Sequence, residues 1–136
     1  MIREINRDII LLKKKCRPAE KKDLPIARDL KDTLVFHQKE CVGMAANMIG
    51  EPVCIIAVMQ FIMPVVMLNP VITAKKQPYD TEEGCLSLSG RRKTTRWQEI
   101  TVRWQDMDFV LHQGTFSGYM AQIIQHECDH LNGIVI

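Results

Sequence analysis

The chain has 136 residues, the length of one folded domain that can bury its own core. Its composition, 46% hydrophobic and 25% charged, is ordinary for a soluble globular protein, and a formal net charge of +2 is too small to indicate a nucleic-acid-binding protein. Five cysteines are an odd number with no paired spacing, and no signal-peptide core is present at the N-terminus, so we expect free thiols and a cytoplasmic location.

The first third of the chain predicts a strand and a helix. Ile9–Lys15 is expected to form a short strand that ends before Pro18. A helix is expected from about Pro25 to Gln38, because proline suits the first turn of a helix and apolar residues recur there at helical spacing. These apolar residues are Ile26, Leu30, Leu34 and Val35.

The middle of the chain is apolar. No charge occurs from Pro52 to Ala74, which on length alone would suit a membrane span, but three prolines would break a helix there. The β-branched clusters instead predict two buried strands, 53–58 and 65–68, separated by a turn at Met63–Pro64, and a further strand near Val71–Lys76. We therefore expect no contact with a membrane.

The last third predicts a loop, a hairpin and a helix. The loop is expected over Glu83–Gly90, and the hairpin pairs residues 100–104 with 109–112 around a turn at Asp106–Asp108. The helix is expected from Gly118 to Leu131, with Ser117 as N-cap and Gly133 beyond its end. Because strands outnumber helices, the prediction is one α+β domain over residues 1–136, with antiparallel or mixed strands packed around the C-terminal helix.

The C-terminal helix carries an H-E-x-x-H sequence formed by His126, Glu127 and His130. Histidines four residues apart lie about 40° apart around a helix, so both imidazoles can reach one metal ion. Glu127 projects toward the buried face and is the candidate general acid/base. We expect Gln122, Gln125 and Asp129 on the opposite arc, with Asp129 forming a salt bridge or supporting a ligand.

The third metal ligand is less clear from the residues alone. Cys128 points about 180° away from the histidine pair, and no residue after His130 can bind a metal, so the ligand should lie upstream. Cys85 has the best surroundings because Gly84 permits a tight turn, although it could also be a buried, inert thiol. The other candidates are Cys16, His37, Cys41, Cys54, His112 and several carboxylates.

Three segments resemble the signature motifs of the peptide deformylase family. They are Val42-Gly-Met-Ala-Ala46, Glu83-Gly-Cys-Leu-Ser87 and Gln125-His-Glu-Cys-Asp-His-Leu131, and they occur in the order and spacing of that family. Met67-Leu-Asn-Pro70 and Arg96 also fall where the family has similar residues. The resemblance covers most of the chain and implies a peptide deformylase-like fold.

The resemblance implies a metal site and a reaction. Cys85, His126 and His130 would hold one divalent metal, usually Fe²⁺ in the family, with Zn²⁺, Ni²⁺ or Co²⁺ also accepted. The metal would supply hydroxide to attack the formyl carbon of an N-formyl-methionyl peptide. Glu127 would carry the proton to the leaving amine, and the backbone N–H of Leu86 would stabilise the oxyanion.

The resemblance also implies how the substrate binds, and where this chain departs from the family. Val42, Gly43 and Ile123 match positions at the methionine pocket and at a backbone site that an extended peptide joins by strand addition. The first motif normally begins with Gly and ends with a Gln that donates to the oxyanion. Here these positions are Cys41 and Met48, and methionine has no donor.

Asn47, next to Met48, is the remaining candidate for a substrate contact, although it would need a backbone shift to act as the missing donor. The expected partners are N-formyl-methionyl nascent peptides and, in passing, the ribosome, with no direct nucleic-acid contact. Family members often carry a C-terminal extension, whereas this chain stops at Ile136. Two alternatives remain: an amidase for another acyl substrate, and a deformylase-like protein of low or no turnover that binds formyl peptides or metal.

Overall fold

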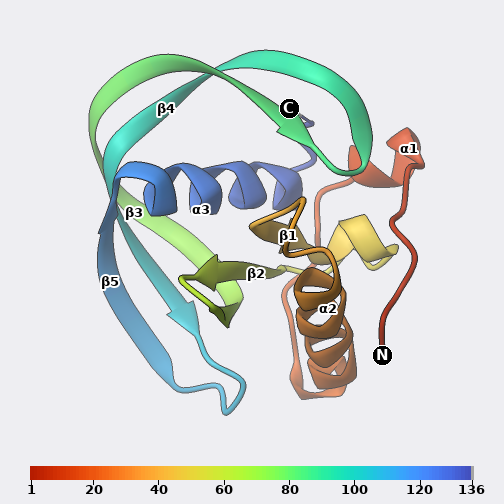
Figure 1. The fold of residues 1–136 in the computed structure, drawn as a ribbon. Helices are drawn as coiled ribbons and strands as arrows, with labels where there is room; N and C mark the ends of the chain where they lie inside the picture. Colours follow the sequence, from red (N-terminus) through yellow and green to blue (C-terminus); the bar gives the residue numbers. More distant parts are fainter. Residues whose placement is uncertain (136) are drawn as a thin grey trace.

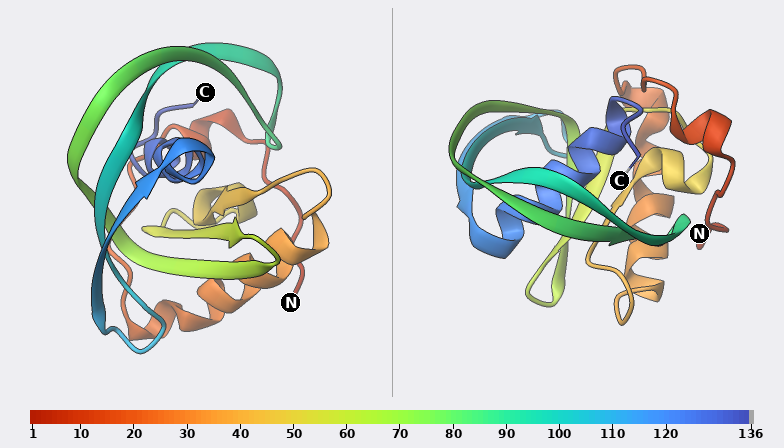
Figure 2. Two further views of the ribbon diagram at one scale, coloured as in Figure 1. Left: turned by 60° about the vertical axis from the view of Figure 1, so that its left-hand side comes forward. Right: turned by 90° about the horizontal axis from the view of Figure 1, so that it is seen from above.

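The computed structural model describes residues 1–135, and its centre is one antiparallel sheet (Figure 1). Each strand pairs with its neighbours along the chain, so the sheet order is β1-β2-β3-β4-β5. β3 and β4 are long and arch around helix α3, which lies inside the curve of the sheet (Figure 2). The predicted α+β arrangement around a C-terminal helix is confirmed. The strands are β1 (Gly43–Ala45), β2 (Ile55–Gln60), β3 (Met63–Cys85), β4 (Leu88–Gln105) and β5 (Leu111–Ser117).

Helices pack on both faces of β2, which explains its apolar run from Ile55 to Met59. Ile55 and Ala57 pack in a core cluster with the buried side of α2 (Leu24–Phe36). Ile56 and Val58 point to the other face and pack with α3 (Gly118–Leu131). A strand buried on both faces has no polar alternation, as the sequence predicted for this segment, although β2 begins two residues later than the expected 53–58. Among the described residues, no helix has both the length and the apolar character needed to cross a membrane.

The two longer helices agree with the sequence prediction. α2 ends two residues earlier than expected, and α3 has the expected bounds. Ser117 is the N-cap of α3, but its side chain makes no capping hydrogen bond. Beyond the helix, Gly133 adopts φ +75° and its N–H donates to the carbonyl of His130. This left-handed residue lies three positions after His130 and ends α3.

The predicted strand at Ile9–Lys15 is wrong. The segment begins instead with the short helix α1 (Ile9–Leu12), because the Asp8 carboxylate accepts a hydrogen bond from the N–H of Ile10 at 3.0 Å and caps the turn. Two short 3₁₀ turns complete the helical segments, η1 (Lys21–Asp23) and η2 (Ala46–Ile49).

The turns between the strands differ from the prediction in three places. Gln60 pairs with Met63, so the chain reverses at Phe61 and Ile62 rather than at Met63–Pro64. The expected loop 83–90 is mostly strand, because β3 continues to Cys85, which pairs with Leu88. The hairpin after Gln105 is present, but its turn is longer than expected: Gln105 pairs with Leu111, and residues 100–104 pair with 112–116 rather than with 109–112. Cys85 therefore lies at the end of a long hairpin, held by a two-residue turn rather than by a loose loop.

Candidate metal centre and active site

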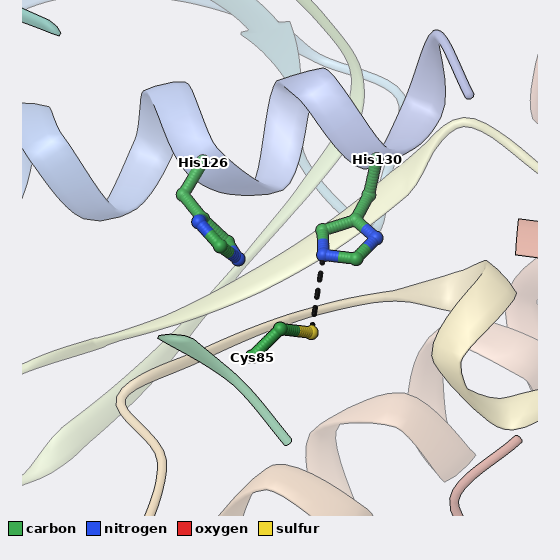
Figure 3. A group of neighbouring side chains, drawn as sticks. All are labelled: Cys85, His126 and His130. Atoms are coloured by element: carbon green, nitrogen blue, oxygen red, sulfur yellow. Dashed lines mark hydrogen bonds between the residues drawn. The ribbon is translucent and has the colours of Figure 1, made fainter. Parts of the chain in front are cut away.

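Helix α3 and the β3–β4 hairpin bring three possible metal ligands together (Figure 3). His126 and His130 are buried on one side of α3, with ring centroids 5.1 Å apart. The thiol of Cys85 reaches the same point, with Sγ 3.3 Å from Nε2 of His130. One ligand atom from each of the three residues lies within 4.8 Å of the others. The sequence left the third ligand open among several residues, and the fold brings Cys85 to the histidine pair.

The chemistry of these donors fits a divalent transition metal. Two imidazole nitrogens and a sulfur, with a further position open, are a donor set found in zinc sites and related metal sites. Burial is the main cause that lowers the pKa of His130 to about 3. Its ring is therefore neutral at pH 7, which is the form that binds a metal.

His126 is oriented by a buried carboxylate. Its Nδ1 lies 2.8 Å from Oε1 of Glu83. Burial alone would raise the pKa of Glu83, but hydrogen bonds from His126, Arg96 and Gln122 outweigh it and hold the pKa at about 2. Burial would lower the pKa of His126, but its hydrogen bonds to Cys85 and Glu83 raise it to about 10 in the metal-free protein. Metal binding by this ring is therefore coupled to the loss of a proton.

Arg96 completes the network around Glu83. Its guanidinium donates from Nη2 to Glu83 Oε1 at 2.7 Å and from Nη1 to Asp129 Oδ2, also at 2.7 Å. The salt bridge expected for Asp129 is thus present. The expectation that Gln122 lies on the opposite arc is wrong, because it precedes His126 by four residues and its side-chain amide donates to Glu83 at 2.9 Å. The general tendency of a ligating histidine to donate to a carboxylate could have pointed to Glu83, two residues before Cys85.

Glu127 is buried beside the ligands. Its Oε1 has no hydrogen-bond partner within residues 1–135, and burial is the main cause that raises its pKa to about 7. β1 passes this carboxylate closely at Gly43. A Cβ at that position would lie 2.6 Å from Cγ2 of Ile123 and 3.0 Å from Oε2 of Glu127, so only glycine permits this approach.

A cavity of about 300 Å³ opens beside these groups, between β1, the β3–β4 hairpin and α3. Its walls include seven of the nine site residues that the sequence predicted: Val42, Gly43, Cys85, Leu86, Ile123, His126 and Glu127. His130 is fully buried beneath the cavity and is not part of its wall. β1 is the end strand of the sheet. The wall therefore offers an edge that an extended chain could join.

Two candidate residues of the first motif take different positions. Met48 forms part of the cavity wall, and its sulfur lies 3.5 Å from the N–H of Ala45. Asn47 is fully buried and does not line the cavity. Its side-chain amide instead donates to the main-chain carbonyl of His130 at 2.9 Å. A role for Asn47 in contacting substrate stays a prediction, and it requires this side chain to leave the carbonyl.

Comparison with known proteins gives a consistent result. The sequence model of the polypeptide deformylase family matches residues 2–136. A peptide deformylase from Clostridium beijerinckii is 47% identical over 138 aligned positions that cover both chains completely. The crystal structure of the Thermus thermophilus peptide deformylase has a TM-score of 0.88 at 32% identity, over 99% of this chain and 84% of that one. A peptide deformylase from Acinetobacter baumannii with Met-Ala-Ser bound has a TM-score of 0.88 at 26% identity, over 99% and 97% of the two chains.

Proposed function

We propose that Cys85, His126 and His130 hold the metal of this chain, which belongs to the polypeptide deformylase family. The chain is a metallo-hydrolase that removes formyl groups from peptides. The observation that carries this assignment is the meeting of three donor atoms within 4.8 Å of one another. The cavity beside them offers room for a substrate, and its wall includes Cys85 and His126.

Glu127 is the proposed general acid/base. When bound at this site, a divalent metal supplies Lewis-acid chemistry and makes water a nucleophile at neutral pH. The Glu127 carboxylate lines the same cavity, and one of its oxygens is buried without a partner among the described residues. It takes a proton from the attacking water and delivers it to the leaving amine. Burial raises its pKa to about 7, which suits a group that must accept and release a proton near neutral pH.

The substrate is proposed to lie along β1. An N-formyl-methionyl peptide in extended form would lie along the outer edge of β1 at Val42 and Gly43, with its methionine side chain near Ile123. Pairing with the Gly43 carbonyl would displace the Cys41 thiol, which lies 2.7 Å from it. The backbone N–H of Leu86 would stabilise the oxyanion. The support is that all four residues line one cavity. The Acinetobacter baumannii relative binds Met-Ala-Ser, which is the deformylated form of such a peptide.

We expect the metal to be Fe²⁺, with Zn²⁺, Ni²⁺ or Co²⁺ as substitutes. We also expect the chain to form one domain, because its two core clusters share β2. All five cysteines are free thiols, which suits the reducing cytoplasm, where nascent peptides and the ribosome are encountered. Thiolate bound to ferrous iron is oxidisable. Activity should therefore fall in air faster for the iron form than for a zinc form. Equal lifetimes of the two forms would contradict the proposed bond between iron and the Cys85 thiolate.

Turnover of formyl-Met-Ala-Ser by protein purified without oxygen tests the catalytic assignment. Glu127→Gln should keep one metal per chain and lose roughly two to four orders of magnitude in rate. Full activity in that variant would remove the proposed role of Glu127. Acetyl-Met-Ala-Ser serves as the matched substrate: cleavage of the acetyl peptide at the same rate would favour an amidase of broader range. Metal binding without cleavage of either peptide would favour a binding protein.

A further inference from the structure

His130 and Asn47 each contain a buried polar atom that lacks a partner within residues 1–135. For His130 this atom is Nδ1, and for Asn47 it is Oδ1. Both residues are completely buried. A buried donor or acceptor without a partner costs about 1–3 kcal/mol, so two such atoms in one region need an explanation.

The two atoms have complementary chemistry if His130 binds a metal, as proposed above. Nε2 of His130 is the nitrogen that faces the Cys85 thiol, at 3.3 Å. A neutral imidazole carries one proton, so a ring that offers the Nε2 lone pair must carry its proton on Nδ1. Nδ1 is then a donor without an acceptor, whereas Oδ1 of Asn47 is an acceptor without a donor.

Asn47 is already attached to the same residue. Its Nδ2 donates to the main-chain carbonyl of His130 at 2.9 Å. In Figure 3 the second ring nitrogen of His130 points away from Cys85 and His126, toward the side of the view on which the η2 segment lies. η2 is the segment that carries Asn47. The amide of Asn47 is therefore fixed beside His130 by this hydrogen bond.

We propose that Asn47 is the positioning residue of His130: its Oδ1 accepts the Nδ1 proton of the ring through one buried water, since the two atoms do not bond directly, while its Nδ2 holds the main-chain carbonyl. This arrangement selects the tautomer with Nε2 free and fixes the ring toward Cys85. Glu83 does the same for His126, where Nδ1 and the carboxylate are 2.8 Å apart. A buried water that joins otherwise unpaired polar atoms is a common element of protein interiors.

A second acceptor competes for this role. Oγ of Ser87 is also buried and has no partner among the described residues. Ser87 follows the ligand Cys85 by two residues, and Arg7 donates to its carbonyl and to that of Leu86. Asn6 in turn donates to the carbonyl of Asn47, so the segments that carry the two candidate acceptors are tied together by neighbouring residues. Asn47 is the stronger candidate because its side chain already contacts His130.

Zinc affinity of the purified full chain, measured by competition with a chelator, is the first test. Partners of this kind are worth 10- to 100-fold in metal affinity. Asn47→Leu, which keeps the approximate shape but has no acceptor, should weaken zinc binding by that factor. Asn47→Asp, which keeps an acceptor but loses the donor to the His130 carbonyl, should restore part of the affinity. Ser87→Ala is the matched control and should bind zinc as the wild type does.

The second test is ¹⁵N NMR of the zinc-loaded protein with labelled histidine, which reports the tautomer and the ring N–H. In the wild type we expect a slowly exchanging Nδ1–H for His130. Asn47→Asp should shift that signal, and Ser87→Ala should leave it unchanged. If Asn47→Leu does not fold, this shift still decides the question. An unchanged signal in Asn47→Asp, or a loss of affinity in Ser87→Ala but not in Asn47→Leu, would overturn the proposal. Failure of the wild type to bind zinc would instead count against the metal ligands themselves.

Discussion

The two histidines of α3 lie four residues apart but are held in opposite ways. Nδ1 of His126 meets a charged carboxylate, and behind that carboxylate lie Arg96, Gln122 and Asp129. His130 is held only by neutral groups, with Asn47 at its main-chain carbonyl and no partner for its Nδ1 among the described residues. If both histidines bind the metal as proposed, one ligand is supported by an ionic network and the other by an amide. We call the surroundings of His126 (Glu83, Arg96, Gln122 and Asp129) the ionic side, and those of His130 (Asn47) the neutral side. We expect the ionic side to control the stability of the protein and its pH dependence. We expect the neutral side to control the tautomer and the orientation of the His130 ring.

The largest effect on metal binding and activity is expected at Cys85, which lies next to both histidines. Cys85→Ala removes the sulfur that lies between the two sides of the site, so it should abolish stoichiometric metal binding and turnover. Metal content by mass spectrometry and a deformylation assay measure this. Cys128→Ala is the matched control, since that thiol is buried on α3 outside the cavity wall. Metal loss in Cys128→Ala, with Cys85→Ala unaffected, would show that the ligand set is wrong.

The second prediction breaks the ionic side. Arg96→Met leaves the buried Glu83 without its guanidinium partner, and removing one member of a buried ion pair costs about 3–5 kcal/mol. Urea unfolding of the metal-free protein should show a loss of this size. Arg28→Met, on the exposed surface of α2, is the control and should change the free energy of unfolding by less than about 0.5 kcal/mol. Equal effects of the two substitutions would mean that the network is not structural.

The third prediction is the pH dependence of the same side. The pKa of Glu83 is lowered from 4.5 to about 2 in the folded protein, so its contribution to stability is complete above pH 4.5 and is lost as the pH falls toward 2. At 1.36 kcal/mol per pKa unit this amounts to roughly 3 kcal/mol. The difference in unfolding free energy between the wild type and Glu83→Gln, both metal-free, should shrink between pH 6 and pH 3. A constant difference would contradict the charged state of Glu83.

The smallest effect is expected next to the neutral side, at Met48. Losing one oxyanion donor costs about 3 kcal/mol of transition-state stabilisation in other hydrolases. A donor newly introduced into the cavity wall should recover only part of that energy. Met48→Gln should therefore raise kcat about tenfold with little change in KM, the pattern of an interaction made only in the transition state.

Asn47→Ala separates the two roles considered for that residue. A fall in kcat at full metal occupancy would mean that Asn47 contacts the oxyanion, as the sequence allowed. Loss of metal affinity would mean that it positions His130. Kinetics unchanged by both Met48→Gln and Asn47→Ala would show that the departure of this chain from the family motif has no cost.

The sequence by itself determined the parts of this protein that depend on local periodicity. α3 and its H-E-x-x-H face follow from helical spacing, and the buried strand β2 follows from an apolar run that contains no charge. The family resemblance followed from short motifs whose order and spacing are visible without a fold. Where local signals were weak, the prediction was wrong. At Ile9–Leu12 a single side-chain cap decided that the segment is helical. After Gln60 the pairing of β2 with β3 decided where the chain turns.

Only the tertiary structure decided which distant groups meet. Cys85 could not be separated from the other possible ligands by residue type, because its position depends on how far β3 runs before it turns. The partners of the histidines lie outside α3 as well as on it: Glu83 and Arg96 come from two strands, and Asn47 comes from a turn more than 80 residues before His130. Hydrogen bonds of this kind depend on the distances between packed elements. Neither periodicity nor composition contains those distances, so the supporting groups of the site become visible only in the folded chain.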